Sequence, residues 1–129
     1  MTSLTDLELE SSYQFVVSNG WSHRIKDFDE WCKIIKNSQR VIVAMDSGHV
    51  IGFARGITDE ASNGYLSMVV VADEYRKQGI GRALVHKIIG DDSGITWVLR
   101  AGRDGAAEFF AKLGFASSTV AMERSRIVQ

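Results

Sequence analysis

In the stretch RKQGIGRAL, which runs from Arg76 to Leu84, two glycines stand three and five residues after a basic residue. The apolar positions that follow recur at helical spacing, so the glycines are expected at a helix N-terminus. There the first backbone N–H groups have no partner in the helix and the dipole is positive, so a glycine lets a phosphate approach those amides closely. The stretch therefore indicates a cradle for a pyrophosphate. A glycine-softened turn with solvated basic side chains fits the same residues.

Two other phosphate-binding motifs are excluded by their spacing. A dinucleotide fingerprint needs G-x-G-x-x-G, but Leu84 stands at the place of its third glycine, and no acidic residue follows a second strand about twenty residues later. A Walker A loop, G-x-x-x-x-G-K-S/T, is absent from the sequence.

The flanking sequence predicts helices and strands in a definite order. Thr5 with Glu8 and Asp27 with Glu30 have the spacing of helix N-terminal caps, and Gly48 lies in a turn between two β-branched runs. Helices are expected over 5–18, 27–37, 80–89 and 104–113, and strands over 40–45, 50–57, 65–71, 95–99 and 115–124. Asp104 is expected to cap the last helix. The order α-α-β-β-β-α-β-α-β predicts an α/β (α+β) fold, a mixed sheet with helices on its faces.

Composition limits the classes of function. The chain has 129 residues, which fits one domain over 1–129, and its formal net charge of -1 offers no footprint for nucleic acid or an anionic membrane. The N-terminus lacks the apolar run of a leader and no segment is long enough to cross a bilayer, so a cytoplasmic location is expected. Cys32 is expected as a small core residue. Three histidines and one cysteine, none at ligand spacing, predict no metal site.

Two blocks of the sequence resemble one known family. The stretch from Val71 to Leu84 is similar to the signature of the GNAT superfamily of N-acetyltransferases, whose core is Q/R-x-x-G-x-G/A. The block AAEFFAKLGF, from Ala106 to Phe115, resembles the family's later A-x-x-F/L-Y-x-K-x-G-F segment. The resemblance implies a GNAT-like, mostly antiparallel sheet, with acetyl-CoA as co-substrate and an amine as acceptor.

The resemblance also implies which residues bind the donor. Amides at the end of the central strand bind the pantetheine arm in this family, the amides of the loop and helix start hold the pyrophosphate, and a β-bulge splays two strands into the cleft. The cofactor-binding residues implied here are Val69, Val70, Val71, Arg76, Lys77, Gln78, Gly79, Ile80, Gly81 and Arg82.

Two positions depart from the family pattern. Arg103 stands where the family commonly has an asparagine that touches the pantetheine arm, so it is expected either to contact a cofactor phosphate or to be solvated. Phe110 replaces the tyrosine that often protonates the departing thiolate, and its ring is expected to pack against the cofactor. A phenyl ring has no proton to give, so the usual general-acid step is in doubt.

The acceptor side is less well defined by the sequence. An amine is mostly protonated at pH 7, so a base is needed, and the candidates are Tyr65 and, through water, Glu60 or Asp59. The resemblance implies that the segment with Trp21 and His23 walls the acceptor site, and a cleft near Trp21, Tyr65 and Trp97 would favour an aromatic or aliphatic amine over a polyanion. Each of these residues also fits a purely structural place. A small-molecule amine, a peptide amine, a homodimer and a non-catalytic acetyl-CoA sensor all stay open.

Overall fold

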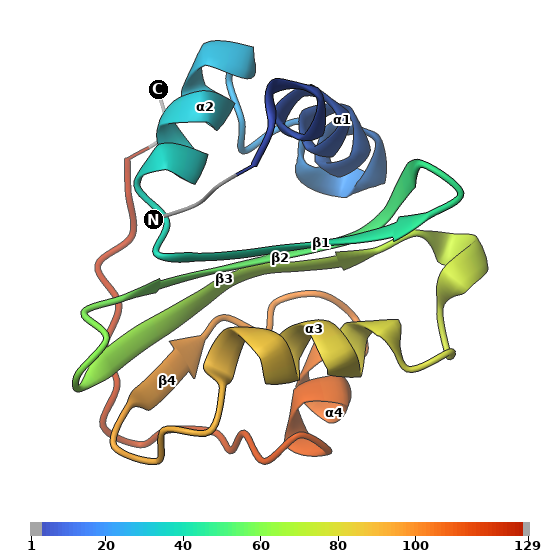
Figure 1. Ribbon diagram of the computed structural model, residues 1–129. Helices are drawn as coiled ribbons and strands as arrows, with labels where there is room; N and C mark the ends of the chain where they lie inside the picture. The colour runs from blue at the N-terminus through green and yellow to red at the C-terminus, as the bar shows by residue number, and fades with distance from the viewer. Residues whose placement is uncertain (1–3, 128–129) are drawn as a thin grey trace.

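The computed structural model describes residues 4–127, and Figure 1 shows a central sheet between two layers of helices. The helices α1 and α2 cover one face of the sheet, and α3 and α4 cover the other. The elements in chain order are α1 (Asp6–Val16), a π-helical turn (Val17–Trp21), α2 (Phe28–Lys36), β1 (Arg40–Asp46), β2 (His49–Thr58), β3 (Asn63–Val71), a 3-10 turn (Asp73–Tyr75), α3 (Ile80–Ile89), β4 (Thr96–Leu99) and α4 (Ala106–Ala111).

The sheet has the strand order β1-β2-β3-β4. The strands β1, β2 and β3 pair antiparallel, and β4 pairs parallel to β3. The parallel pair is joined by the crossover through α3, which is the connection that parallel strands require. A mixed, mostly antiparallel sheet with helices on both faces is therefore confirmed.

Both helices of the α1–α2 layer begin at side-chain caps. The Thr5 hydroxyl accepts from the backbone N–H of Glu8 at 3.1 Å while the Glu8 carboxylate accepts from the Thr5 N–H at 2.9 Å, which completes a capping box. Asp27 caps α2 by accepting from the Glu30 N–H at 2.9 Å. Trp31 packs fully buried against Phe53 of β2, with ring centroids 5.2 Å apart, so this layer has its own core against the sheet.

The α3–α4 layer packs closely on the opposite face. Gly52 of β2 lies so near α3 that a Cβ atom there would be 3.1 Å from Leu84 and 3.3 Å from Ile80. A β-bulge accompanies this approach, because Ala44 pairs with Gly52 and Met45 with Val50, which leaves Ile51 as the extra residue of β2. Gly52 thus lies both at a bulge and in close contact with the helix.

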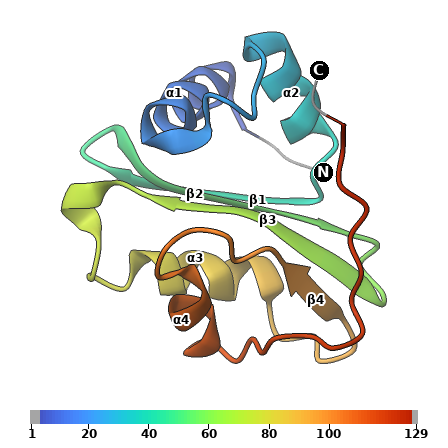
Figure 2. The same ribbon diagram turned by 180° about the vertical axis from the view of Figure 1, so that it is seen from behind.

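Two local predictions at the C-terminal end are wrong. The helix α4 begins after Gly105, which has a positive φ of 80°, and no side chain caps it, so Asp104 is not its N-cap. The expected strand over 115–124 does not form within the described residues; Figure 2 shows this segment passing along the side of the molecule towards the level of α2. The Ser118 hydroxyl accepts from the N–H groups of Val120 and Ala121, at 3.1 and 2.9 Å, and so takes amides that a strand ladder would use.

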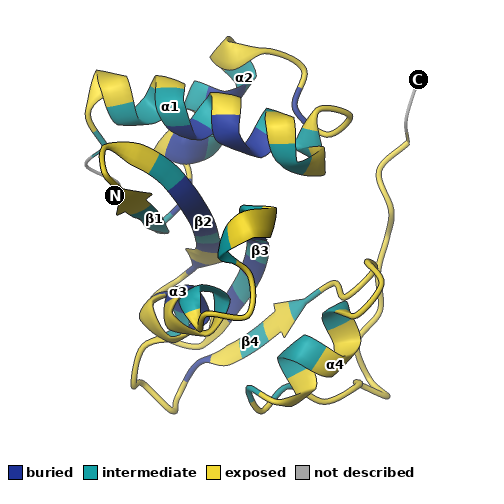
Figure 3. Cartoon of the chain, turned by 90° about the vertical axis from the view of Figure 1, so that its right-hand side faces the viewer, coloured by how far each residue is buried: buried dark blue, intermediate teal, exposed yellow. Residues whose placement is uncertain are grey.

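The segment after α4 has few large apolar side chains, and those at Val120 and Met122 are exposed. Val120 is 86% exposed and Met122 97%, so neither side chain has a buried face to join. Figure 3 shows the contrast with the buried inner sides of β2 and β3. No helix within residues 4–127 combines the length and the apolar character that crossing a membrane requires.

Candidate functional site

The first feature of the site is the parting of β3 from β4. Their pairing runs from Asn63 with Thr96 to Leu66 with Leu99, and β3 then continues to Val71 without a partner strand on that side among the described residues. A bulge marks the same place: Arg55 of β2 pairs with Met68 and Gly56 with Leu66, so Ser67 is the extra residue of β3. The free edge from Ser67 to Val71 leaves backbone donors and acceptors for another group.

The second feature is the loop between β3 and α3. Its backbone turns left-handed twice, at Lys77 with φ of 64° and at Gly79 with φ of 83°. A side chain at Gly79 would meet no atom within 4 Å, so this glycine is required by its backbone conformation and not by crowding. Alternating conformations of this kind turn successive N–H groups towards one side, as in anion-binding backbone nests.

The N-terminus of α3 is open towards that loop. No side chain caps it, and the bond from the Ala83 N–H to the Gly79 carbonyl oxygen, 3.0 Å, closes its first turn. The amides of Ile80, Gly81 and Arg82 therefore precede the intrahelical ladder. The helix has ten residues and carries no acidic side chain in its first turn, so its positive end is not neutralised locally.

Gly81 has a different role from Gly79. A Cβ atom at Gly81 would be 3.1 Å from the Phe109 ring of α4 and 3.6 Å from Val71. The absence of a side chain lets α4 pack against the start of α3 and the end of β3. This contact joins the two sequence blocks in space, which neither block indicates by itself.

The side chains of the loop make only a few, mostly exposed contacts. Arg76 pairs with Asp73 at 3.0 Å, and its Nε donates to the Val71 carbonyl at 3.4 Å. The Gln78 amide donates to the Glu74 carbonyl at 3.3 Å. Lys77 and Arg82 are exposed. Val70 is buried in the α1–α2 core, so only its backbone faces the edge of β3.

A cleft of about 1520 Å³ lies against the paired part of the two strands, where Tyr65 of β3 and all four residues of β4 line it. Tyr65 of β3, Phe110 of α4 and His23 of the α1–α2 connection all line it, although they are far apart in sequence. Trp21 is not part of the lining. The Arg103 guanidinium instead stacks over the Trp21 ring, with Cζ 5.0 Å from the ring centroid. Nη2 of Arg103 also donates a hydrogen bond to the Gly20 carbonyl oxygen at 3.4 Å. Arg103 thus connects the β4–α4 loop with the α1–α2 connection.

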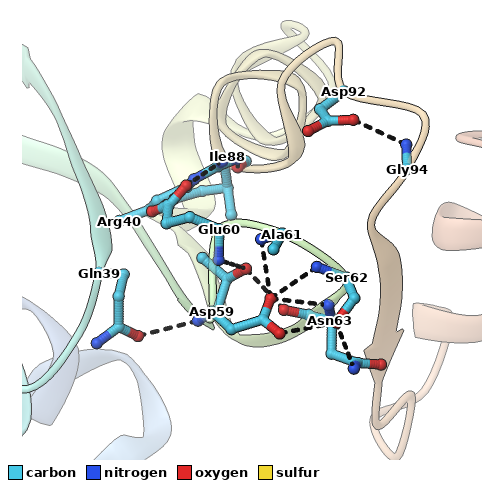
Figure 4. A network of polar contacts seen from close by, with 11 residues as sticks. Gln39, Arg40, Asp59, Glu60, Ala61, Ser62, Asn63, Ile88, Asp92 and Gly94 are labelled. Carbon is cyan, nitrogen blue, oxygen red and sulfur yellow. Dashed lines mark hydrogen bonds and ion pairs between the residues drawn. The ribbon is translucent and has the colours of Figure 1, made fainter.

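The acidic candidates on the β2–β3 turn have other partners (Figure 4). The Asp59 carboxylate accepts from the N–H groups of Ala61, Ser62 and Asn63 at 2.8 to 3.0 Å, and these hydrogen bonds hold its pKa well below the usual range. The Glu60 carboxylate is bound by Arg40 at 2.6 Å, which lowers its pKa. Neither carboxylate lines the cleft. These contacts show that both carboxylates help to shape the turn.

The sequence of residues 37–117 matches the family described as Acetyltransferase (GNAT) domain. The chain belongs to the GNAT family. The matched range includes the end of β3, the left-handed loop, the open start of α3 and the Phe109 contact, so the shared pattern covers the features described above. No curated protein matches the chain in sequence.

Solved structures share the GNAT fold at low sequence identity. A protein assigned to the GNAT family from Xanthomonas campestris pv. campestris is 23% identical, with a TM-score of 0.76 over 95% of this chain and 91% of its own. A GNAT family protein from Streptococcus pneumoniae is 18% identical, with a TM-score of 0.70 over 96% of both chains. AAC(6')-Iy, in complex with the bisubstrate analogue CoA-S-monomethyl-acetylneamine, is 17% identical, with a TM-score of 0.70 over 98% and 97%.

Sequence reasoning named Trp97 for the cleft, which it lines, but missed its contact with Gly64. The indole ring covers Gly64, where a Cβ atom would lie 2.5 Å from it, and so fixes the junction of β3 and β4; a glycine inside a strand was the available signal. Arg24, Arg100 and the segment after α4 line the cleft, and no local pattern indicates that they meet. Within residues 4–127, no group of three or more His, Cys, Asp or Glu side chains is placed to hold a metal ion.

Proposed function

We propose that this GNAT protein transfers the acetyl group of acetyl-CoA to a primary amine, by direct attack of the amine in a ternary complex. The observation that carries the proposal is the continuity of the donor half. The unpaired edge of β3 from Ser67 to Val71 runs into the left-handed loop and the uncapped start of α3. These features fit the two chemically distinct parts of the donor, an amide-bearing arm and a pyrophosphate.

The edge of β3 suits the pantetheine arm. That arm carries two amide groups, which hydrogen-bond to a free strand edge as an added peptide strand does. The backbone of Val69 and Val71 is the proposed partner, and the amides of Gln78 to Arg82 are the proposed pyrophosphate ligands. The half-buried ring of Phe110 lines the cleft and supplies an apolar wall for the reacting end. We further propose that the Arg103 guanidinium moves away from the Trp21 ring and contacts a phosphate of the donor.

The reaction that follows is an acyl transfer. Acetyl-CoA supplies a thioester; the neutral amine nitrogen bonds to its carbonyl carbon and releases one proton to water, the carbon–sulfur bond breaks, and CoA leaves as a thiolate that takes a proton from water. The amine must first lose its own proton, which costs roughly 4 to 5 kcal/mol for an amine of pKa near 10.4 at pH 7. Tyr65 is the proposed group that handles this proton, because its side chain lines the cleft.

A second candidate is a module that binds acetyl-CoA without turning it over. It is favoured by one observation: Phe110 lines the cleft at the position where the family usually has a tyrosine hydroxyl. Against it, a thiolate with a pKa near 8.5 leaves without a dedicated acid, and positioning alone supplies much of the acceleration of an acyl transfer.

Two measurements test the proposal together. Calorimetry with acetyl-CoA is expected to give saturable binding, and a free-thiol assay with polyamines, aminoglycosides, arylalkylamines, amino acids and peptides is expected to give turnover with at least one member. Binding without turnover by any member favours the sensor. Failure to bind acetyl-CoA at all contradicts both candidates.

A further inference from the structure

Basic side chains are concentrated around the cleft. The chain as a whole is nearly neutral, with 15 lysines and arginines against 16 aspartates and glutamates. The cleft departs from this balance, because its lining contains one carboxylate, Glu123, among several cationic groups. The cationic or titratable basic residues of the lining are His23, Arg24, Arg100, Arg124 and Arg126.

These cations are separate from the proposed phosphate cradle. No residue of the loop or of the first turn of α3, from Arg76 to Arg82, lines the cleft. The phosphates of the donor therefore do not account for the arginines. The cleft instead contains Tyr65 and Phe110, which places it on the side proposed for the acceptor.

Two of the arginines are available for an incoming anion. The Arg24 guanidinium is exposed and makes no hydrogen bond or ion pair with any residue between 4 and 127. Arg100 holds Glu123 at 2.8 Å, but both side chains are about half exposed, at 54% and 49%. An ion pair in that setting is weak, so a ligand carboxylate or phosphate can replace Glu123 at little cost.

The cleft lining also contains apolar side chains that are less exposed than the arginines. Tyr65, Leu99, Phe110 and Phe115 are half-buried and line it, and they come from β3, β4, α4 and the segment after α4. Such a surface binds a hydrocarbon or aromatic body by excluding water. An apolar floor with a cationic rim suits a molecule that is apolar in the middle and negative at one end.

We propose that the acceptor is a primary amine that also carries an anionic group, a carboxylate or a phosphate, on an apolar or aromatic body. The proposal rests on the proposed function and specifies its substrate class. Arg24 and Arg100 bind the anionic group, the half-buried side chains hold the body, and the amine lies towards Tyr65. Amines with several positive charges are repelled by the same rim.

The test is a free-thiol assay with matched acceptors. Tyrosine is compared with tyramine for the carboxylate, and phosphoethanolamine with ethanolamine for the phosphate. We expect the anionic member of at least one pair to have the higher kcat/KM, and Arg24→Ala to reduce that preference roughly fivefold, the factor that corresponds to about 1 kcal/mol for two unit charges near 4 Å in water. Using the same pair in both proteins cancels the difference in amine basicity.

Lys26→Ala is the matched control, because Lys26 is exposed on the same connection but does not line the cleft. It is expected to leave the preference unchanged. An equal preference for both members of each pair, a preference for the amine without the anion, or the same loss in Lys26→Ala and Arg24→Ala overturns the proposal while leaving acetyl transfer intact.

A binding measurement separates this proposal from the proposed function. With the protein saturated by CoA, calorimetry is expected to show tighter binding of the anionic amine, weakened in Arg24→Ala and not in Lys26→Ala. That result supports the substrate class even if no acceptor releases thiol, in which case acetyl transfer alone is rejected. No measurable binding of tyrosine or phosphoethanolamine, or binding indifferent to Arg24, rejects the substrate class even if another amine is acetylated.

Discussion

The two halves of the site are built in different ways. The proposed donor half is one continuous stretch, from the free edge of β3 through the left-handed loop to the start of α3, and its polar groups are mostly backbone amides. The proposed acceptor half brings together the α1–α2 connection, β3, β4 and the segment after α4, and its polar groups are side chains. A site made of backbone is tied to local conformation, whereas a site made of distant side chains changes with single substitutions and leaves the fold in place.

This contrast suits a family whose members share a donor. The backbone cradle depends on few side chains, so it tolerates divergence of the surrounding sequence. Structural neighbours keep the fold at sequence identities from 17% to 23%.

The largest effect is expected from Gly79→Val in the donor half. The valine strains the left-handed backbone and shields the open amides of α3, so acetyl-CoA affinity should fall roughly hundredfold, as for the loss of one or two hydrogen bonds to a charged group at about 1.5–3 kcal/mol each. Calorimetry measures this change.

Gly48→Val is the control for that experiment. Gly48 has a φ of 82°, close to the 83° of Gly79, and both positions have open space around the missing Cβ. The two variants therefore carry similar backbone strain, but Gly48 lies in the β1–β2 turn. Comparable losses of affinity in both would mean that general destabilisation, and not access to the amides, explains the result.

Gly64→Ala should come next, because it acts on the junction where the two halves meet. The added methyl group would lie 2.5 Å from the Trp97 ring, so the indole must move and the free energy of unfolding should fall by about 1–3 kcal/mol. We expect a lower thermal midpoint and a raised KM for the acceptor, with acetyl-CoA affinity changed less than fivefold, roughly 1 kcal/mol.

Gly102→Ala provides the comparison, since its missing Cβ has no neighbour within 4 Å. It should leave the thermal midpoint close to that of the wild type. If Gly64→Ala weakens acetyl-CoA binding as strongly as Gly79→Val does, the two halves are not independent.

The same contrast explains what the sequence could predict. The helices, the hairpin and the glycine-containing loop before α3 follow from caps, glycines and apolar spacing within short windows, as Thr5, Asp27 and Gly79 illustrate. The free end of β3 was expected only from the family resemblance. The strand expected over 115–124 did not form, because Ser118 diverts backbone amides and the apolar side chains there find no buried face. The presence of both Arg24 and Arg100 in the lining of the cleft, and the binding of Glu60 by Arg40, depend on chain folding over long distances and have no local signature.

Phe110→Tyr should have a smaller effect, because it adds only a hydroxyl group to a side chain that lines the cleft. If the protein is an enzyme whose thiolate leaves without an acid, the variant should keep its acetyl-CoA affinity and alter kcat by less than the roughly hundredfold expected of an essential general acid. Steady-state kinetics and calorimetry on the same preparation measure both quantities. Turnover that exists only in the variant would instead identify the natural protein as the sensor.

Glu60→Gln is expected to have the smallest effect, and it tests whether the β2–β3 turn belongs to the acceptor half at all. The Glu60 carboxylate is held by Arg40, whose guanidinium also donates to the Ile88 carbonyl at 2.6 Å and lies 5.4 Å from the Trp97 ring centroid. A carboxylate fixed in this way supports the turn and does not face the cleft. Since glutamine keeps the shape and one oxygen acceptor, kcat/KM should change less than twofold, within the range of an exposed ion pair.

Because Arg40 lowers the pKa of Glu60, the stabilisation from this pair is present above the unfolded pKa near 4.3 and is lost as the pH falls through the lower folded value. The thermal midpoints of wild type and variant should therefore converge in acid, while their rates stay alike at neutral pH. A loss of kcat near hundredfold, with the midpoint unchanged, would restore Glu60 as the base that acts through water.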